Sequence, residues 1–241
     1  MMPLVYLVSV LIRSSAGSLA FLAAVATHLL PGCVTLRPFE EVRRSLPAER
    51  FTELGGRSVY FERQGAGEAV VLIHGFGGST FSFRKVAPEL ARDYDVIALD
   101  LHGFGYTQRP ADPAAYTITA QRDLVLGLMD RLGVARAHIV GHSYGAGVAL
   151  LMAQENPDRV RSIVLVDGGA PGGGPPAAPL FNILRPLMAP FVAQVLTEAN
   201  IRRILESTVY DASVVDADMV NGYLGRLRIE ALEPLRAHAR A

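Results

Sequence analysis

The chain has 241 residues and a mass of 25.9 kDa, enough for one sizeable domain or a domain with a small insertion. Half of the residues are hydrophobic and 19% are charged, which excludes intrinsic disorder as a description of the whole chain. The 23 Lys and Arg residues equal the 23 Asp and Glu residues, so no basic excess points to a nucleic-acid partner. The single cysteine, Cys33, excludes an internal disulfide framework and a cysteine-based zinc site.

The first thirty residues carry one charge, Arg13, between apolar runs over residues 3–12 and 18–30. Neither run reaches the roughly 20 residues that span a bilayer, but the second has the length of a secretory signal core. The segment ending at Cys33 resembles a bacterial lipoprotein signal, in which that cysteine is lipidated. An uncleaved anchor over residues 2–30 and a cytosolic chain are the alternatives. We expect residues 1–33 to export the protein or attach it to a membrane.

Residues 34–50 are polar and are expected to form a linker, after which the pattern becomes that of a folded core. Residues 51–54 and 58–63 alternate in polarity around Gly55-Gly56, which predicts a hairpin. Four continuous apolar runs of strand length follow, at residues 69–73, 94–99, 138–140 and 161–166. Such runs are typical of a parallel sheet covered by helices on both faces.

Helical patterns separate these strands, at residues 86–92, around 125–132 and at 144–155. Gly133 occupies the position expected just past the end of the second helix. The alternation predicts an α/β fold with a doubly wound, mostly parallel sheet over residues 51–169. Residues 170–179 are rich in Pro and Gly and predict a linker. Helical segments at 180–196, 201–205 and 214–227 follow without a strand, so residues 170–241 are expected to form a helical cap.

The chemistry is expected at the Gly-His-Ser-Tyr-Gly sequence of residues 141–145, between a short apolar strand and a helix. A Gly-x-Ser-x-Gly pattern in this context indicates a nucleophile elbow, where the serine stands on a strained turn. Gly141 and Gly145 remove the side chains that would clash there. The start of the helix adds partial positive charge where an oxyanion would form. Ser143 is therefore the candidate nucleophile.

Two further segments follow the first two apolar strands in the order that this chemistry needs. One is the His-Gly-Phe-Gly-Gly sequence of residues 74–78, and the other is the glycine-containing loop over residues 100–110. Together with the serine motif they resemble the α/β-hydrolase superfamily, most closely its cap-bearing esterase and C–C bond hydrolase branches. The resemblance runs from about residue 51 to residue 167 and implies that the backbone N–H groups of Phe76 and Tyr144 form an oxyanion hole. A serine at position 143 argues against the branches that use a carboxylate nucleophile, the haloalkane dehalogenases and epoxide hydrolases.

In this superfamily an acid and then a histidine follow the nucleophile along the chain. The only histidine after Ser143 is His238, near the end of a helical segment, and it is expected to be an exposed residue rather than the base. Asp167, at the end of the fourth apolar run, is a candidate acid, with a turn-capping role as the alternative. No apolar strand follows the expected cap. We therefore expect a truncated hydrolase that lacks its last strands, its acid and its base, and that leaves a sheet edge and apolar faces uncovered.

The sequence thus favours a serine hydrolase acting on an ester or related carbonyl compound. A catalytically incomplete, membrane-tethered relative that only binds, and a transacylase, are the alternatives. The expected cap offers mostly apolar side chains, which favour packing between cap and core; for the substrate they indicate at most an apolar acyl group (Leu180, Phe181, Leu184, Leu187, Met188, Phe191 and Val192). No cofactor or metal is implied, because His74, His102 and His142 lack ligand spacing on one face. The substrate and the oligomeric state are not specified by the sequence.

Overall fold

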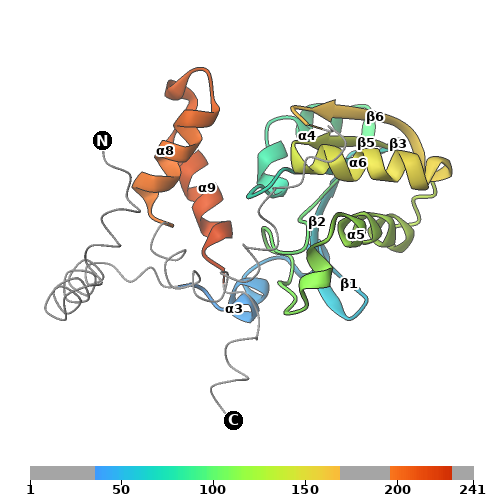
Figure 1. Cartoon of the computed structure of the whole chain (residues 1–241), viewed down its shortest axis with the longest axis horizontal. Coiled ribbons are helices and arrows are strands. Elements are labelled where there is room, and N and C mark those ends of the chain that lie inside the picture. Colours follow the sequence, from blue (N-terminus) through green and yellow to red (C-terminus); the bar gives the residue numbers. More distant parts are fainter. Residues whose placement is uncertain (1–35, 169–195, 230–241) are drawn as a thin grey trace, which may run out of the picture.

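A computed structural model describes residues 36–168 and 196–229 of the chain (Figure 1). It contains a six-stranded sheet with the strand order β1-β2-β4-β3-β5-β6. The last three neighbouring pairs, β4 with β3, β3 with β5 and β5 with β6, are parallel, whereas β1 and β2 join the sheet in antiparallel fashion. The predicted mostly parallel α/β architecture is therefore confirmed.

The antiparallel edge is the hairpin expected from the sequence. Strand β1 (Phe51–Leu54) pairs with β2 (Arg57–Gln64) across Gly55 and Gly56. Both glycines have positive φ angles, +56° and +73°, which side-chain-bearing residues seldom adopt. This geometry matches the right-handed twist of the two strands and fixes their register.

The parallel strands carry the apolar runs of the sequence. They are β3 (Glu68–Ile73), β4 (Tyr94–Leu99), β5 (Ala137–His142) and β6 (Val160–Val166). Side chains of β3 alternate between two cores: Val71 and Ile73 face one, and Val70 and Leu72 face the other. Both faces of β3 are buried, which is why its sequence reads as a continuous apolar run.

Helices cover both faces of the sheet. Helices α5 (Ile118–Arg131) and α6 (Tyr144–Glu155) pack on one face, and α4 (Ala87–Leu90) with η2 (Thr80–Phe83) packs on the other. Helix α5 begins where the Thr117 side chain accepts the Ala120 N–H, and Gly133 follows its C-cap with a φ of +71°. Two further 3-10 turns, η3 (Pro113–Tyr116) and η4 (Pro157–Arg159), precede α5 and β6.

The segment expected to be a polar tether is partly a packed element. Helix α3 (Phe39–Arg44) and η1 (Ala48–Arg50) lie within it. Phe39 and Val42 are buried in a cluster with Ile229, from the other end of the described chain. The prediction of a plain linker was wrong here. Phe39 and Val42 stand among charged residues in the sequence, and they are buried because they pack against Ile229, about 190 positions away.

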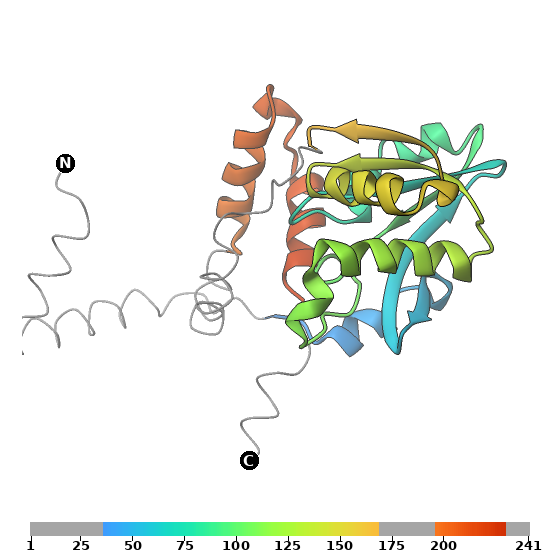
Figure 2. The same ribbon diagram turned by 45° about the vertical axis from the view of Figure 1, so that its right-hand side comes forward.

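The C-terminal described region is helical, as predicted. It consists of α8 (Glu198–Thr208), η5 (Ala212–Val214) and α9 (Ala217–Leu227), which share a small apolar cluster. In both views α9 lies between α8 and the α/β core, on the side to which the arrowhead of β6 points (Figures 1 and 2). The helix pair therefore stands over the carboxyl ends of the parallel strands.

Strand β6 is the outermost described strand on its side of the sheet. Its Val164, Leu165 and Val166 are 50%, 38% and 44% exposed, so among the described residues this edge carries uncovered apolar surface. The segment 1–33, the linker 170–179 and the expected helix 180–196, apart from its last residue, lie outside the described residues. Within the described ranges, no helix combines the length and the apolar character needed to cross a membrane.

Candidate active site

Ser143 stands on a strained turn between β5 and α6. Its φ and ψ angles are +50° and −111°, a conformation that costs about 1–3 kcal/mol and persists only where the surroundings impose it. The Ser143 N–H donates to the Val166 carbonyl oxygen at 2.9 Å, and its own carbonyl accepts the Ala146 N–H at 3.0 Å. The end of β6 and the first turn of α6 thus hold the serine in the geometry of a nucleophile elbow.

The glycines of the motif are required by close backbone approach. A Cβ atom at Gly141 would lie 2.6 Å from the Ala146 Cα, and one at Gly145 would lie 2.7 Å from the His74 carbonyl oxygen. Distances below 3.0 Å are essentially absent between real atoms of these kinds. The two glycines allow α6 to start directly against β3, which explains their spacing around the serine.

The loop after β3 brings the second predicted donor beside the serine. A Cβ atom at Gly75 would lie 3.0 Å from the Ser143 Cβ, so the residue before Phe76 touches the elbow. Within the described part of the chain, the N–H groups of Phe76 and Tyr144 donate no hydrogen bond. The Tyr144 N–H also opens α6, where the helix dipole favours negative charge. Among the described residues, the arrangement thus leaves two N–H groups near Ser143 free to meet an acceptor.

Aromatic rings support the Phe76 loop. The Phe76 ring, 75% exposed, packs edge-on against Phe104 at 5.3 Å between centroids, and Phe104 packs against buried His74 at 5.5 Å. Nε2 of His74 accepts the Leu101 N–H at 3.0 Å, so Nδ1 carries the proton and donates to the Gly75 carbonyl oxygen at 2.7 Å. Burial lowers the pKa of His74 to about 4, so the imidazole is neutral near pH 7 and ties this loop to the next.

Neither buried His102 nor half-buried His142 makes a hydrogen bond with the serine hydroxyl. The backbone of His102 is held by the Gln121 side chain through two hydrogen bonds of 3.0 Å, and burial lowers the pKa of its imidazole to about 4. The His142 ring lies against Gly75. Across the described ranges, no histidine nitrogen is hydrogen-bonded to Ser143.

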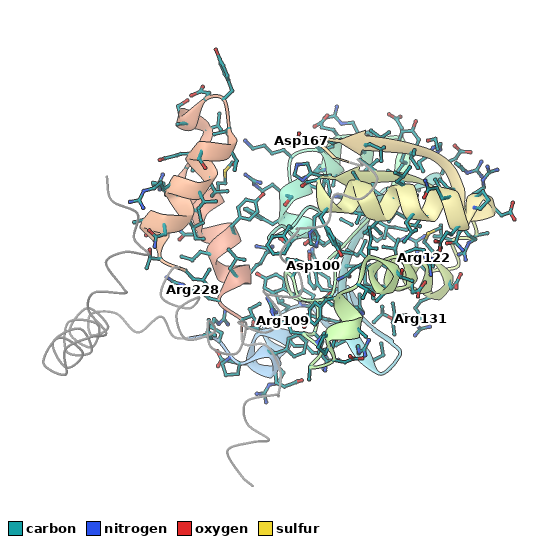
Figure 3. All side chains as sticks on the ribbon, viewed as in Figure 1. Asp100, Arg109, Arg122, Arg131, Asp167 and Arg228 are labelled. Carbon is teal, nitrogen blue, oxygen red and sulfur yellow. The ribbon has the colours of Figure 1, made fainter. Side chains whose placement is uncertain are left out.

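Asp167 follows β6 with a φ of +50°, at the end of the strand that holds the Ser143 N–H (Figure 3). The next residue, Gly168, is so close that a Cβ atom there would lie 2.7 Å from the Ser143 Cα. Asp167 is thus near the elbow in the fold, but among the described residues its carboxylate has no hydrogen-bond partner. His238, Cys33 and the apolar residues at 180–192 lie outside the described residues.

The structure also brings together polar groups that sequence reasoning missed. The Ser162 hydroxyl lies 2.8 Å from Nδ1 of His138, whose Nε2 lies 3.2 Å from a Glu68 carboxylate oxygen. This chain of groups sits at the amino ends of β3, β5 and β6, at the opposite edge from Ser143. The three residues come together because their strands are neighbours in the sheet, and no local sequence motif predicts the cluster. The described segments contain no cluster of three His, Asp or Glu side chains suited to a metal ion.

Asp100 is a second missed residue, although it opens the glycine-containing loop. Its side chain is fully buried and accepts backbone N–H groups from Thr80 and Tyr106. The signal available in the sequence was an acidic residue directly after an apolar strand.

Comparison with known proteins agrees with this geometry. A family profile described as "alpha/beta hydrolase fold" matches residues 68–214. The uncharacterized hydrolase YugF of Bacillus subtilis is 34% identical over 179 residues, covering 73% of this chain and 65% of its own. The 2-hydroxymuconate semialdehyde hydrolase of Pseudomonas sp. strain CF600 is 36% identical over 170 residues, covering 69% of this chain and 55% of its own. The chain thus spans less than two thirds of the length of these relatives.

Solved structures show the same fold. The meta-cleavage product hydrolase of Pseudomonas fluorescens IP01 superposes with a TM-score of 0.59 at 27% identity, covering 78% of this chain and 65% of that one. The epoxide hydrolase CorEH, at 23% identity and a TM-score of 0.59, covers 74% of this chain and 69% of that one and shares the fold alone. Since the family profile covers more than half of the sequence and the strand order, elbow and adjoining loop agree with it, the chain belongs to the α/β-hydrolase fold family.

Proposed function

We propose that this protein is a serine hydrolase that acts on an ester or a related carbonyl compound with an apolar acyl group. The observation that carries the proposal is the conformation of Ser143, strained at φ +50° and set beside two N–H groups that have no acceptor among the described residues. Strain at a non-glycine residue between a strand and a helix has a ready explanation as pre-organisation of a nucleophile. The relative named as a semialdehyde hydrolase supports a carbonyl substrate.

In the proposed reaction the Ser143 hydroxyl oxygen attacks the carbonyl carbon and gives its proton to a general base. The electron pair of the carbonyl bond moves to the oxygen, which the Phe76 and Tyr144 N–H groups stabilise. Collapse of this intermediate breaks the bond to the leaving group, which takes up the proton. Water then attacks the acyl-enzyme, and the acid product and free serine are released. Removing one such donor costs about 100- to 1,000-fold in rate in comparable enzymes.

The proposed reaction also needs a general base and an acid that orients it. Asp167 is the candidate acid from the described residues, and His238 is the candidate base in the sequence. A catalytically incomplete, membrane-tethered protein that keeps the fold and only binds is the second proposal, favoured because no histidine nitrogen of the described residues is hydrogen-bonded to Ser143. A transacylase is the third, because an alcohol can replace water in attack on the same acyl-enzyme. A relative named as an acetyltransferase component, 41% identical over 120 residues, supports it.

The test is reaction of the full chain with p-nitrophenyl esters and with a fluorophosphonate probe. We expect Ser143→Ala to abolish both reactions, while the control Ser162→Ala keeps them. Ser162 is a suitable control because it is exposed and has the imidazole partner that Ser143 lacks among the described residues. Loss in the control with retention in Ser143→Ala would contradict the proposal. No reaction in a folded wild-type chain would favour the non-catalytic alternative, and product transfer to added alcohol would favour the transacylase.

The expected export or membrane attachment through residues 1–33 is a separate proposal. It is tested by fractionating cells that express the full chain and a variant beginning at residue 34. We expect the full chain in the membrane or exported fraction and the shortened chain in the cytosol, and equal distribution would contradict the proposal.

A further inference from the structure

The carboxylate of Asp100 connects two loops of the site. It is buried at the end of β4, in the interior between the sheet and α9 (Figure 3). One oxygen accepts the Thr80 N–H at 2.6 Å, and the other accepts the Tyr106 N–H at 2.7 Å. Charge-assisted hydrogen bonds of this length are the strong ones in proteins. A single side chain thus holds one loop with each oxygen.

The first of these loops, residues 74–83, contains the Phe76 N–H, and the second, residues 100–110, contains the Phe104 ring that packs on Phe76. Because Thr80 is four residues past Phe76 and Tyr106 is two residues past Phe104, Asp100 fixes both partners of this aromatic contact. Movement of either loop would change the direction of the Phe76 N–H.

The same two loops contact helix α9. The Arg226 guanidinium lies over the ring of Phe81 and over the ring of Tyr106, at 4.7 Å in each case. The Tyr223 hydroxyl lies 3.1 Å from the Ser82 hydroxyl, and the two aromatic rings of Tyr223 and Phe81 meet edge-on at 5.4 Å. Each loop therefore has its own contact with α9, and Asp100 is the group that joins them.

The surroundings of Asp100 leave it little freedom. Gly105 lies directly against the carboxylate with a φ of +52°, so no side chain fits there. The Asp100 carbonyl oxygen accepts the Thr107 hydroxyl at 2.6 Å, and the Thr107 oxygen accepts the Tyr60 N–H at 2.9 Å. Backbone and side chain of Asp100 are thus both fixed, as a positioning group requires.

We propose that Asp100 is a positioning residue whose carboxylate, by accepting one N–H from each loop, sets the Phe76 N–H and helix α9 relative to Ser143. The inference rests on the proposed role of Phe76 and Ser143. An oxyanion donor works only when it lies about 2.7–3.1 Å from the developing charge, so a loop displaced by about 1 Å costs on the order of 100-fold in rate. Asp100 touches neither substrate nor nucleophile and acts through the loops.

Charge makes this link sensitive to pH. The groups around the carboxylate are Arg226 from α9, Arg109 from its own loop, Glu62 from β2 and His74, which accepts the neighbouring Leu101 N–H. Burial raises the pKa of Asp100 to about 6, against the opposing effect of the two N–H donors and Arg226. Opening that exposes the carboxylate to water restores its ordinary pKa, so opening becomes less favourable as the pH falls through 6, and exchange in both loops and α9 should slow together.

The test is hydrogen exchange of the full chain, followed by mass spectrometry, in wild type and in Asp100→Asn. Asparagine keeps the shape but has one acceptor oxygen, so one loop loses its partner. We expect at least tenfold faster exchange at pH 7.5 in peptides covering 76–83, 101–107 and 217–227, with β5 and α6 unchanged. Asp95→Asn, on the same strand but paired with Arg63, is the control and should leave these three peptides unchanged.

Wild-type rates in all three peptides of Asp100→Asn, or a uniform increase over the whole chain, would overturn the inference. A pH series on the wild type, corrected for intrinsic exchange, keeps the test decisive if the variant fails to fold. It should show a coordinated change in the three peptides near pH 6, and a flat series would overturn the inference. Exchange needs no activity, so it separates this inference from the proposed function. If Ser143 is labelled at equal rates in wild type and Asp100→Asn, the positioning role fails and the nucleophile stands.

Discussion

The close approach of α6 to β3 behind Ser143 makes a sharp prediction for Gly145→Ala. The added methyl group would lie 2.7 Å from the His74 carbonyl oxygen and even closer to that of Ile73. Normal contact between these atoms needs more than 3.0 Å, and the partners are backbone atoms of a central strand that cannot rotate away. The helix must therefore move away from the sheet, and the elbow moves with it.

The size of the effect follows from two opposing contributions. Overpacking of a core costs about 1–3 kcal/mol and reaches the upper end where backbone must shift. Alanine in place of glycine within a helix returns about 1 kcal/mol. We expect a net loss of about 2 kcal/mol in the free energy of unfolding. For a domain of this size each kcal/mol corresponds to about 2–4 °C in the melting temperature.

Gly147→Ala is a matched control in the same helix, two residues away. Its methyl group would meet only the end of the Ile118 side chain, at 3.3 Å, and that flexible group can give way. The control should gain up to about 1 kcal/mol. Urea and thermal unfolding followed by circular dichroism measure both variants. Equal stability of the two, or a more stable Gly145→Ala, would refute the reasoning that close backbone approach dictates the motif.

Burial lowers the pKa of the His74 and His102 imidazoles from 6.5 to about 4. The unfolded chain therefore binds protons at these residues more readily than the folded chain, and the free energy of unfolding should fall as the pH drops from 6.5 to 4. The loss is about 3 kcal/mol for each group, while Asp100, whose pKa is raised, opposes it by about 3 kcal/mol between pH 6 and 3.8. Urea unfolding at pH 7 and pH 4.5 should therefore show a net loss at the lower pH, and equal stability would be inconsistent with the burial of both histidines. Phe39→Ala should cost about 3–5 kcal/mol and speed hydrogen exchange around Ile229, because the two side chains share a buried cluster. Unchanged exchange there would mean that α3 does not hold the end of α9.

The central part of the fold could be predicted from the sequence because its signals are local. Strand β4 begins and ends at the residues predicted for it, since an apolar run buried on both faces has clear limits. Helix α6 likewise matches its prediction from Tyr144 to Glu155, where Asn156 and Pro157 end it. Helix α4 is shorter than predicted, at four residues. Periodicity alone does not show where tertiary contacts end a helix.

The features that were missed depend on contacts between distant residues. Helix α3 is buried through Ile229, and the Arg37 N–H donates to the Arg228 carbonyl oxygen at 2.7 Å. Nothing near residue 39 in the sequence carries that information. Asp100 was likewise identifiable only as part of a loop motif, because its two N–H partners lie 20 and six residues away. The turn at Ser143 was predictable because Gly141 and Gly145, the two glycines that the close backbone approach requires, lie within two residues of it in the sequence.

The most direct test of the central claim is the site of the adduct after fluorophosphonate treatment of the full chain. Tandem mass spectrometry of the digested protein reads which serine carries the phosphonyl group. The account predicts one adduct, on Ser143, because only this serine combines a strained elbow with two N–H groups that have no acceptor among the described residues. An adduct on Ser162 or another serine, or an unmodified Ser143 in protein shown to be folded, would contradict it.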